Sequence, residues 1–118
     1  MSEDKNSGIV KYSWGYSLEW ATHSQFNGKI LVFEKADNKT LLHFHRENES
    51  VWVVNSGKFK VRWVNTANAE VLEAELAEGF TYRAKALQPV QLIALEDKSS
   101  VTEVSNTTGE EDIYYLSE

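Results

Sequence analysis

The stretch that decides the fold is "LLHFHRENESVWVVNSGKF", which runs from Leu41 to Phe59. It holds two of the three histidines of the 118-residue chain, His43 and His45. Successive side chains of a β-strand point to opposite faces, so two residues that are two apart share a face. In a strand, both imidazoles therefore project from one side. Such a pair offers two nitrogen ligands, and a nearby carboxylate would extend it to a partial site for Zn, Fe, Mn or Ni.

Alternating segments surround this stretch. In "KFKVRWV" (58–64) basic residues alternate with Phe59, Val61 and Trp63, which is the period of a half-buried strand. The turn residues "NSG" (55–57) separate it from the β-branched run "VWVV" (51–54). Further strands are expected in "YSWGYSLEW" (12–20), "KILVFEKA" (29–36), "TLLHFH" (40–45), "FTYRA" (80–84), "VQLIAL" (90–95) and "SVTEVS" (100–105).

One segment, "ANAEVLEAELAEG" (67–79), supports two interpretations. It is rich in helix formers, and Leu72 and Leu76 lie at helical spacing. Yet Leu72, Ala74 and Leu76 also alternate with glutamates, which fits a half-buried strand. Because the flanking segments are strands, we expect a strand here too. Many short strands without a convincing helix indicate a sandwich or barrel.

Composition and charge restrict the function. The length predicts one core, with a flexible N-terminus at 1–10 and a single domain at 11–118. A net charge of −6 argues against a general nucleic-acid or membrane surface, and the lack of cysteine excludes disulfides and thiol nucleophiles. No signal peptide is apparent, and no apolar run approaches the ~20 residues that cross a bilayer, so we expect a cytoplasmic protein.

The segment "HFHRENESVWVVNSG" (43–57) resembles the first sequence motif of the cupins, in which His-x-His precedes a Glu and a Gly-ended hairpin. More narrowly, the chain resembles the cupin domain of the type II mannose-6-phosphate isomerases. Their conserved elements are matched by "YSWGY" (12–16), "NGKILVFE" (27–34) and "TEVSNTTGEEDI" (102–113), so that the resemblance covers almost the whole chain. It implies an all-β, cupin-type jelly-roll β-barrel (double-stranded β-helix) with metal and substrate in the barrel mouth.

The resemblance also implies a set of metal ligands. Family members place a metal-binding Glu five residues after the second His, where this chain has Ser50; Glu49 lies one residue earlier. Because a one-residue shift turns a side chain to the other face, Glu49 reaches the metal only if a shorter loop or a bulge re-aims it. The third histidine of the family falls on Val90, which cannot coordinate. The expected group is therefore His43, His45 and Glu49, with Zn, Mn, Ni or Fe as the divalent metal.

Three further residues are candidates for substrate binding. Arg83 and Lys85 lie on one face of a strand that borders the pocket in the family, and they could bind a phosphate. The alternative is a solvated basic face. Trp52 shares a face with Ser50 and is expected inside the barrel, either against the ligand or as part of the core.

Three functions remain open at this point. Metal-dependent sugar-phosphate isomerisation needs a base, for which the candidates are Glu49, or Glu103 if its strand faces inward. Tyr115 stands where the family has an arginine that helps with phosphate or proton transfer. The alternatives are a non-catalytic cupin that binds a sugar or nucleotide-sugar without metal, and a dimeric interaction module, since many cupins form homodimers.

Overall fold

The computed structural model describes residues 8–106 and 112–116. Regular structure in these ranges consists of strands, and no helix among the described residues could span a membrane. The strands are β1 (Ile9–Tyr12), β2 (Gly15–Thr22), β3 (Phe26–Phe33), β4 (His43–Phe44), β5 (Ser50–Ser56), β6 (Lys58–Asn65), β7 (Glu70–Ala77), β8 (Thr81–Ala84), β9 (Val90–Ala94), β10 (Ser99–Asn106) and β11 (Tyr114–Tyr115).

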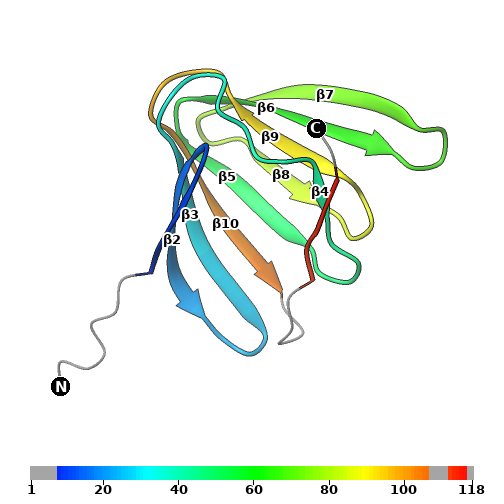
Figure 1. The fold of residues 1–118 in the computed structure, drawn as a ribbon, viewed down its shortest axis with the longest axis horizontal. Coiled ribbons are helices and arrows are strands. Elements are labelled where there is room, and N and C mark those ends of the chain that lie inside the picture. Colours follow the sequence, from blue (N-terminus) through cyan, green and yellow to red (C-terminus); the bar gives the residue numbers. More distant parts are fainter. Residues whose placement is uncertain (1–7, 107–111, 117–118) are drawn as a thin grey trace.

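The strands form two antiparallel sheets. One has the order β1-β2-β3-β10-β5-β8 and the other β11-β4-β9-β6-β7. Figure 1 shows β2, β3, β10 and β5 as one wall and β6, β7 and β9 as the other, with connections that pass between the sheets. This arrangement confirms the predicted jelly roll. The segment with two interpretations is the strand β7, paired with β6 along its whole length.

The core consists of the inward-facing side chains of both sheets. Phe33 on β3 and Phe59 on β6 are fully buried, and their rings meet edge to face with centroids 5.1 Å apart. Trp14 stacks on Phe33, with ring centroids 4.4 Å apart. Aromatic rings in such arrangements bury large areas and add directional contacts between the two sheets.

The N-terminal part differs from the prediction. The segment 12–20 was expected to form one strand, but the chain reverses between Tyr12 and Gly15, so that β1 and β2 form a hairpin. Gly15 has φ = 148°, and a Cβ there would collide with the backbone of Val32. Glycine is therefore required at this turn. The predicted flexible end at 1–10 lies mostly outside the described residues, and its last two residues belong to β1.

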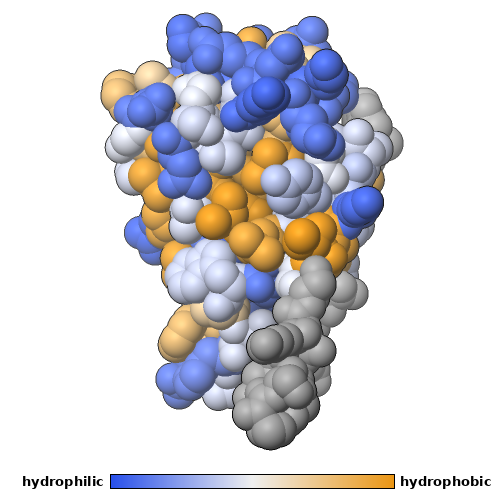
Figure 2. All heavy atoms as spheres, turned by 90° about the vertical axis from the view of Figure 1, so that its left-hand side faces the viewer, coloured by the Kyte–Doolittle hydropathy of each residue, from blue (hydrophilic) through white to orange (hydrophobic). Residues whose placement is uncertain are grey.

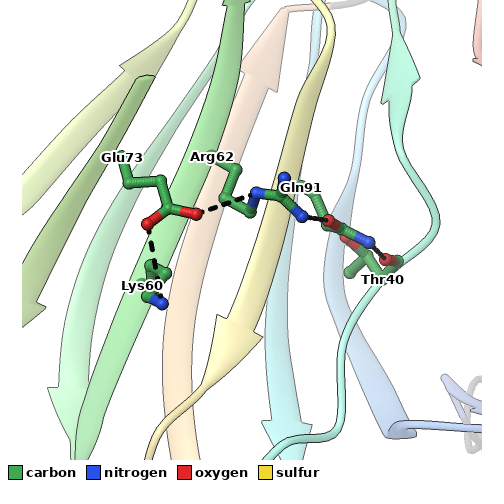
Figure 3. Close-up of polar contacts among 5 residues, drawn as sticks. All are labelled: Thr40, Lys60, Arg62, Glu73 and Gln91. Atoms are coloured by element: carbon green, nitrogen blue, oxygen red, sulfur yellow. Dashed lines mark hydrogen bonds and ion pairs between the residues drawn. The ribbon is translucent and has the colours of Figure 1, made fainter. Parts of the chain in front are cut away.

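The outer face of the five-stranded sheet is polar (Figure 3). Glu73 lies 3.6 Å from Lys60 Nζ and 3.0 Å from Arg62 Nε. Arg62 also donates to the Gln91 side chain at 3.4 Å, and Gln91 donates to the Thr40 carbonyl at 2.9 Å. This polar row presents charge to water and leaves the opposite face of β6 and β9 for the core.

Candidate functional site

A cavity of about 470 Å³ opens between the two sheets. Its aromatic wall comes from both ends of the chain and from β5, through Tyr12, Trp14, Trp52 and Tyr115. Its acidic and basic side chains are Lys29, Asp37, Lys39, His43, His45 and Glu103, and Ser13, Asn38 and Thr40 also line it. A hollow of this size with aromatic walls and a few polar groups has the features of a small-molecule site.

One row of side chains across the six-stranded sheet supplies two of these polar groups, Lys29 and Glu103. Lys29 on β3, Glu103 on β10 and Trp52 on β5 are register partners in adjacent strands, so all three point to the same, inner face. The Trp52 indole Nε1 donates a 2.6 Å hydrogen bond to Glu103 Oε1. Glu103, one of the two carboxylates considered as a base, therefore lies inside the barrel.

The two histidines face this row from the other sheet. His43 lies on β4 and His45 just after it; their rings are perpendicular, with centroids 5.8 Å apart. His43 Nδ1 donates to the Leu41 carbonyl at 2.8 Å, which fixes the tautomer and leaves Nε2 with its lone pair. Burial lowers the pKa of both imidazoles, and the charge of Glu103 opposes that shift only in part. Near pH 7 both rings are therefore neutral.

This burial predicts a pH-dependent stability. The unfolded chain titrates His43 near its ordinary pKa of 6.5, whereas the folded chain holds that pKa lower. Between the two values the unfolded state binds more protons, so stability is complete above about pH 6.5 and falls as the pH decreases below it. The slope from His43 is at most about 1.4 kcal/mol per pH unit. Urea unfolding at several pH values would measure it, and the slope should decrease in His43→Asn. An equal slope in both proteins would contradict this origin.

The residues around the histidines do not fit a three-ligand metal site. Ser50 is buried and Glu49 lies on the opposite face, where its carboxylate binds Arg83 at 2.6 and 3.0 Å. Val90, the replacement of the third histidine, is the register partner of His43 and is 1% exposed. Among the described residues, no three His, Asp or Glu side chains are grouped so that they could hold a metal. The structure thus does not bring Glu49 to His43 and His45.

The predicted phosphate-binding pair is also separated from the cavity. Along β8, Tyr82 and Ala84 face inward, so the intervening Arg83 points outward to Glu49. That hydrogen bond is the main reason why the pKa of the Glu49 carboxyl is lowered. Lys85 is exposed and, like Arg83, is absent from the cavity lining. Of the three predicted substrate-binding residues, only Trp52 lines the cavity.

The C-terminal segment closes one side of the cavity. The Asp112 carboxylate accepts backbone N–H groups from Arg46, Glu47 and Asn48 at 2.8–3.1 Å, and these bonds lower its pKa. Beyond this anchor, Tyr115 pairs with His43 in the sheet. The position where the family carries an arginine therefore does lie at the cavity, with a phenol in place of the guanidinium.

The sequence reasoning missed Lys29 and the residues Asp37 and Lys39. Lys29 alternates with Leu31 and Phe33, so its inward direction was readable from the strand pattern. Asp37 and Lys39 lie in the connection before β4, which is fixed by bonds to β9 such as Asp37 N–H to the Ala94 carbonyl at 2.8 Å. That long-range pairing leaves no local signal in the sequence.

Comparison with known proteins supports the fold alone. No protein-family model matches the sequence, and no curated protein matches it. Among solved structures, the capsular polysaccharide assembling protein CapF from Staphylococcus aureus is similar with a TM-score of 0.78, 18% identity and 93% of this chain covered. Oxalate decarboxylase from Bacillus subtilis is similar with a TM-score of 0.81 and 14% identity, and 94% of this chain is covered. The oxalate decarboxylase from Lactobacillus farciminis is similar with a TM-score of 0.79 and 14% identity, again with 94% of this chain covered.

Both kinds of protein are cupins, so the chain has a cupin fold, as its sequence predicted. The match covers 34% of the CapF chain, 30% of the Bacillus subtilis oxalate decarboxylase chain and 34% of the Lactobacillus farciminis one, so this chain spans about a third of their length. The likeness to mannose-6-phosphate isomerase stays a prediction.

Proposed function

We propose that this protein binds an uncharged sugar, or the sugar part of a larger molecule, in the barrel cavity and without a metal. The observation that carries the proposal is the row Lys29–Glu103–Trp52 facing two neutral histidines across one cavity. Neutral imidazoles, a carboxylate and an ammonium group together provide both donors and acceptors, which is what a ring of hydroxyl groups needs. The aromatic walls supply the apolar surface against which the ring can pack.

Size and charge support this ligand class. A cavity of about 470 Å³ is within the range of small-molecule sites. Its two lysines, Lys29 and Lys39, are balanced by Asp37 and Glu103. A phosphate dianion would lack an excess of positive charge there, since Arg83 and Lys85 lie outside the cavity. The balanced wall favours a neutral ligand.

The structural neighbours are compatible with a small oxygen-rich ligand. The oxalate decarboxylase from Lactobacillus farciminis was solved as a formate complex, and CapF is described as a capsular polysaccharide assembling protein. These statements concern those proteins. They support the choice of a sugar as the first class of ligand to test with this one.

The test is a calorimetric titration with uncharged hexoses and N-acetylhexosamines beside their phosphate esters. We expect an uncharged sugar to bind and Glu103→Gln to weaken it by about tenfold or more, since the charged acceptor that bonds Trp52 and faces the cavity becomes a neutral amide. Arg83→Gln, which removes a charge outside the cavity, should leave the affinity unchanged. Preference for a sugar phosphate that is lost in Arg83→Gln would contradict the proposal, as would the absence of binding by every sugar.

Metal-dependent sugar-phosphate isomerisation is the second candidate. One observation favours it: His43 donates Nδ1–H to a backbone carbonyl, as metal-ligating histidines commonly do, and directs Nε2 elsewhere. The obstacle is the third ligand, because Glu49 would have to leave Arg83 and cross to the other face of the sheet. Elemental analysis of the untagged protein beside a His43→Ala/His45→Ala variant tests it. Stoichiometric metal that disappears in the variant would favour this second function.

A further inference from the structure

The lining of the cavity divides into a deep end and a mouth. The deep end consists of side chains that are buried, namely Trp14, Leu31, His43 and Trp52. At the mouth, Tyr12 and Tyr115 line the same cavity but are 42% and 57% exposed. They come from opposite ends of the chain, Tyr12 from β1 and Tyr115 from β11. The two aromatic rings are therefore available to the part of a ligand that extends from the deep end toward solvent.

The ring of Tyr12 is the outermost of three stacked rings. Trp14 stacks on Phe33, and Tyr12 stacks on Trp14 with centroids 4.6 Å apart and only 8° between the ring planes. This stacking covers one face of the Tyr12 ring, so its exposed surface belongs to the other face and the edge. The turn that carries Trp14 is tied to the connection before β4, because the Asn38 side-chain amide donates to the Trp14 carbonyl at 2.9 Å. Tyr12 thus presents a positioned flat surface at the mouth.

Tyr115 is positioned by the C-terminal segment. The Asp112 anchor described above precedes it, and Tyr115 itself pairs with His43 in the sheet. The neighbouring Tyr114 stacks on Phe44 with ring centroids 5.3 Å apart. Successive side chains of a strand point to opposite faces, so the Tyr115 ring is turned to the cavity, where its centroid lies 6.3 Å from that of His43. Two adjacent tyrosines therefore have different surroundings, one against Phe44 and one at the mouth.

Exposed hydrophobic side chains also gather elsewhere on the molecule. Figure 2, which views the molecule from the side where β2 and β3 lie in Figure 1, shows hydrophobic residues in a central patch below a strongly hydrophilic end. Tyr12 and Tyr115 differ from such surface residues because they line a cavity together with side chains that donate and accept hydrogen bonds. Aromatic surface beside a few directed polar groups is the composition of a ligand site.

The charges of the cavity lining restrict the kind of ring that these tyrosines can bind. Both a sugar and a nucleobase can pack on an aromatic face. A nucleotide would also bring the negative charge of its phosphates. Among the described residues that line the cavity, Lys29 and Lys39 are balanced by Asp37 and Glu103, and Asp37 and Lys39 are themselves exposed. This balance favours a neutral ring, and hence a second sugar, over a nucleotide.

We propose that the mouth is a second sugar subsite, in which Tyr12 and Tyr115 bind the second ring of a neutral disaccharide or longer oligosaccharide. The first ring occupies the deep end, so this inference rests on the sugar binding proposed above and adds the class of sugar. The cavity volume of about 470 Å³ lies within the range of sites for drug-sized ligands, which are larger than one sugar ring. The half-exposed position of both tyrosines leaves room for further sugar units outside the cavity.

The test is a calorimetric titration with maltose, cellobiose and N,N′-diacetylchitobiose, each beside the methyl glycoside of its own monosaccharide unit. We expect at least one disaccharide to bind about fivefold or more tightly than the matching methyl glycoside, because the second ring gains contacts on aromatic surface. Tyr12→Ala and Tyr115→Ala should each lower this ratio of affinities toward one. Tyr114→Ala is the matched control, since it removes the adjacent ring, which does not line the cavity, and should leave the ratio unchanged.

The second subsite and sugar binding itself fail in different ways. If methyl glycosides bind and no disaccharide binds more tightly, the subsite is wrong while sugar binding stands; if neither kind of sugar binds, both are wrong. A ratio that is the same in the wild type and in both tyrosine variants would overturn the subsite, as would an equal decrease in Tyr114→Ala. Tighter binding of uridine diphosphate glucose than of every disaccharide would overturn it too.

A measurement on the wild type covers the case in which a tyrosine variant fails to fold. In saturation-transfer NMR, irradiation of the aromatic protons of the protein should transfer saturation to both rings of the bound disaccharide, because Trp52 lies at the deep end and the two tyrosines lie at the mouth. Saturation confined to one ring of every disaccharide in the series would overturn the second subsite.

Discussion

Replacing Phe33 with alanine is expected to lower the free energy of unfolding by about 3–5 kcal/mol. The ring is fully buried, stacks on Trp14 and meets Phe59 edge to face, so it joins the N-terminal hairpin, β3 and the second sheet. Its removal leaves a cavity that these large neighbours cannot close without leaving their own contacts. Urea unfolding followed by circular dichroism gives the difference directly if both proteins unfold in two states.

Phe26→Ala is the matched control for this prediction. Phe26 is on the same strand but is 45% exposed and stacks on His23 at the tip of a hairpin. The same change there should cost less than about 1 kcal/mol. Similar losses at the two positions would show that the core is not organised around Phe33.

The second large effect concerns Val90. Substitution by histidine is expected to raise the affinity for Zn²⁺ by at least about 100-fold, because three imidazoles make a complete protein ligand set whereas two do not. Val90 is the register partner of His43, so the new imidazole would lie beside that of His43. The Nδ1–H of His43 donates to the Leu41 carbonyl, which leaves its Nε2 available as a ligand. The larger side chain should cost about 1–3 kcal/mol of stability in this packed position.

Competition with a chromogenic zinc chelator measures this affinity. Val90→Phe is the control, since it adds a ring of similar size without ligand atoms. Adding His43→Ala to Val90→His should return the affinity to the level of the wild type. If the wild type already binds zinc as tightly as Val90→His, then His43, His45 and a carboxylate suffice, and the metal-free account of the cavity is contradicted.

The fold was predictable because its signals are local. Strict alternation in "KFKVRWV" and the shared face of His43 and His45 depend only on neighbouring residues, and both segments are strands or strand ends in the structure. The hairpin at Gly15 was missed because a positive φ at glycine is permitted but not demanded by the sequence. Strand existence is thus more predictable here than the exact places where the chain turns.

The site was only partly predictable, since it depends on register between strands that are distant in sequence. Glu49 and Ser50 differ by one position, and β5 starts so that Ser50 is buried while Glu49 meets Arg83. This one-residue difference in register places the Glu49 carboxylate on the outer face of the sheet instead of in the cavity. The row of Lys29, Glu103 and Trp52 likewise depends on the pairing of β3 with β10 and of β10 with β5. The register of strands so far apart in the sequence cannot be predicted from local patterns.

Sugar binding in the cavity is tested most directly by the NMR signal of the Trp52 indole N–H, which donates to Glu103 inside the barrel. The four tryptophans give four indole signals, and Trp52→Phe identifies the one in question. With uncharged monosaccharides at about 20 mM, enough for a millimolar ligand, the Trp52 signal should shift and saturate while that of exposed Trp20 stays in place. A Trp52 signal that does not move with any sugar in the series would contradict the account.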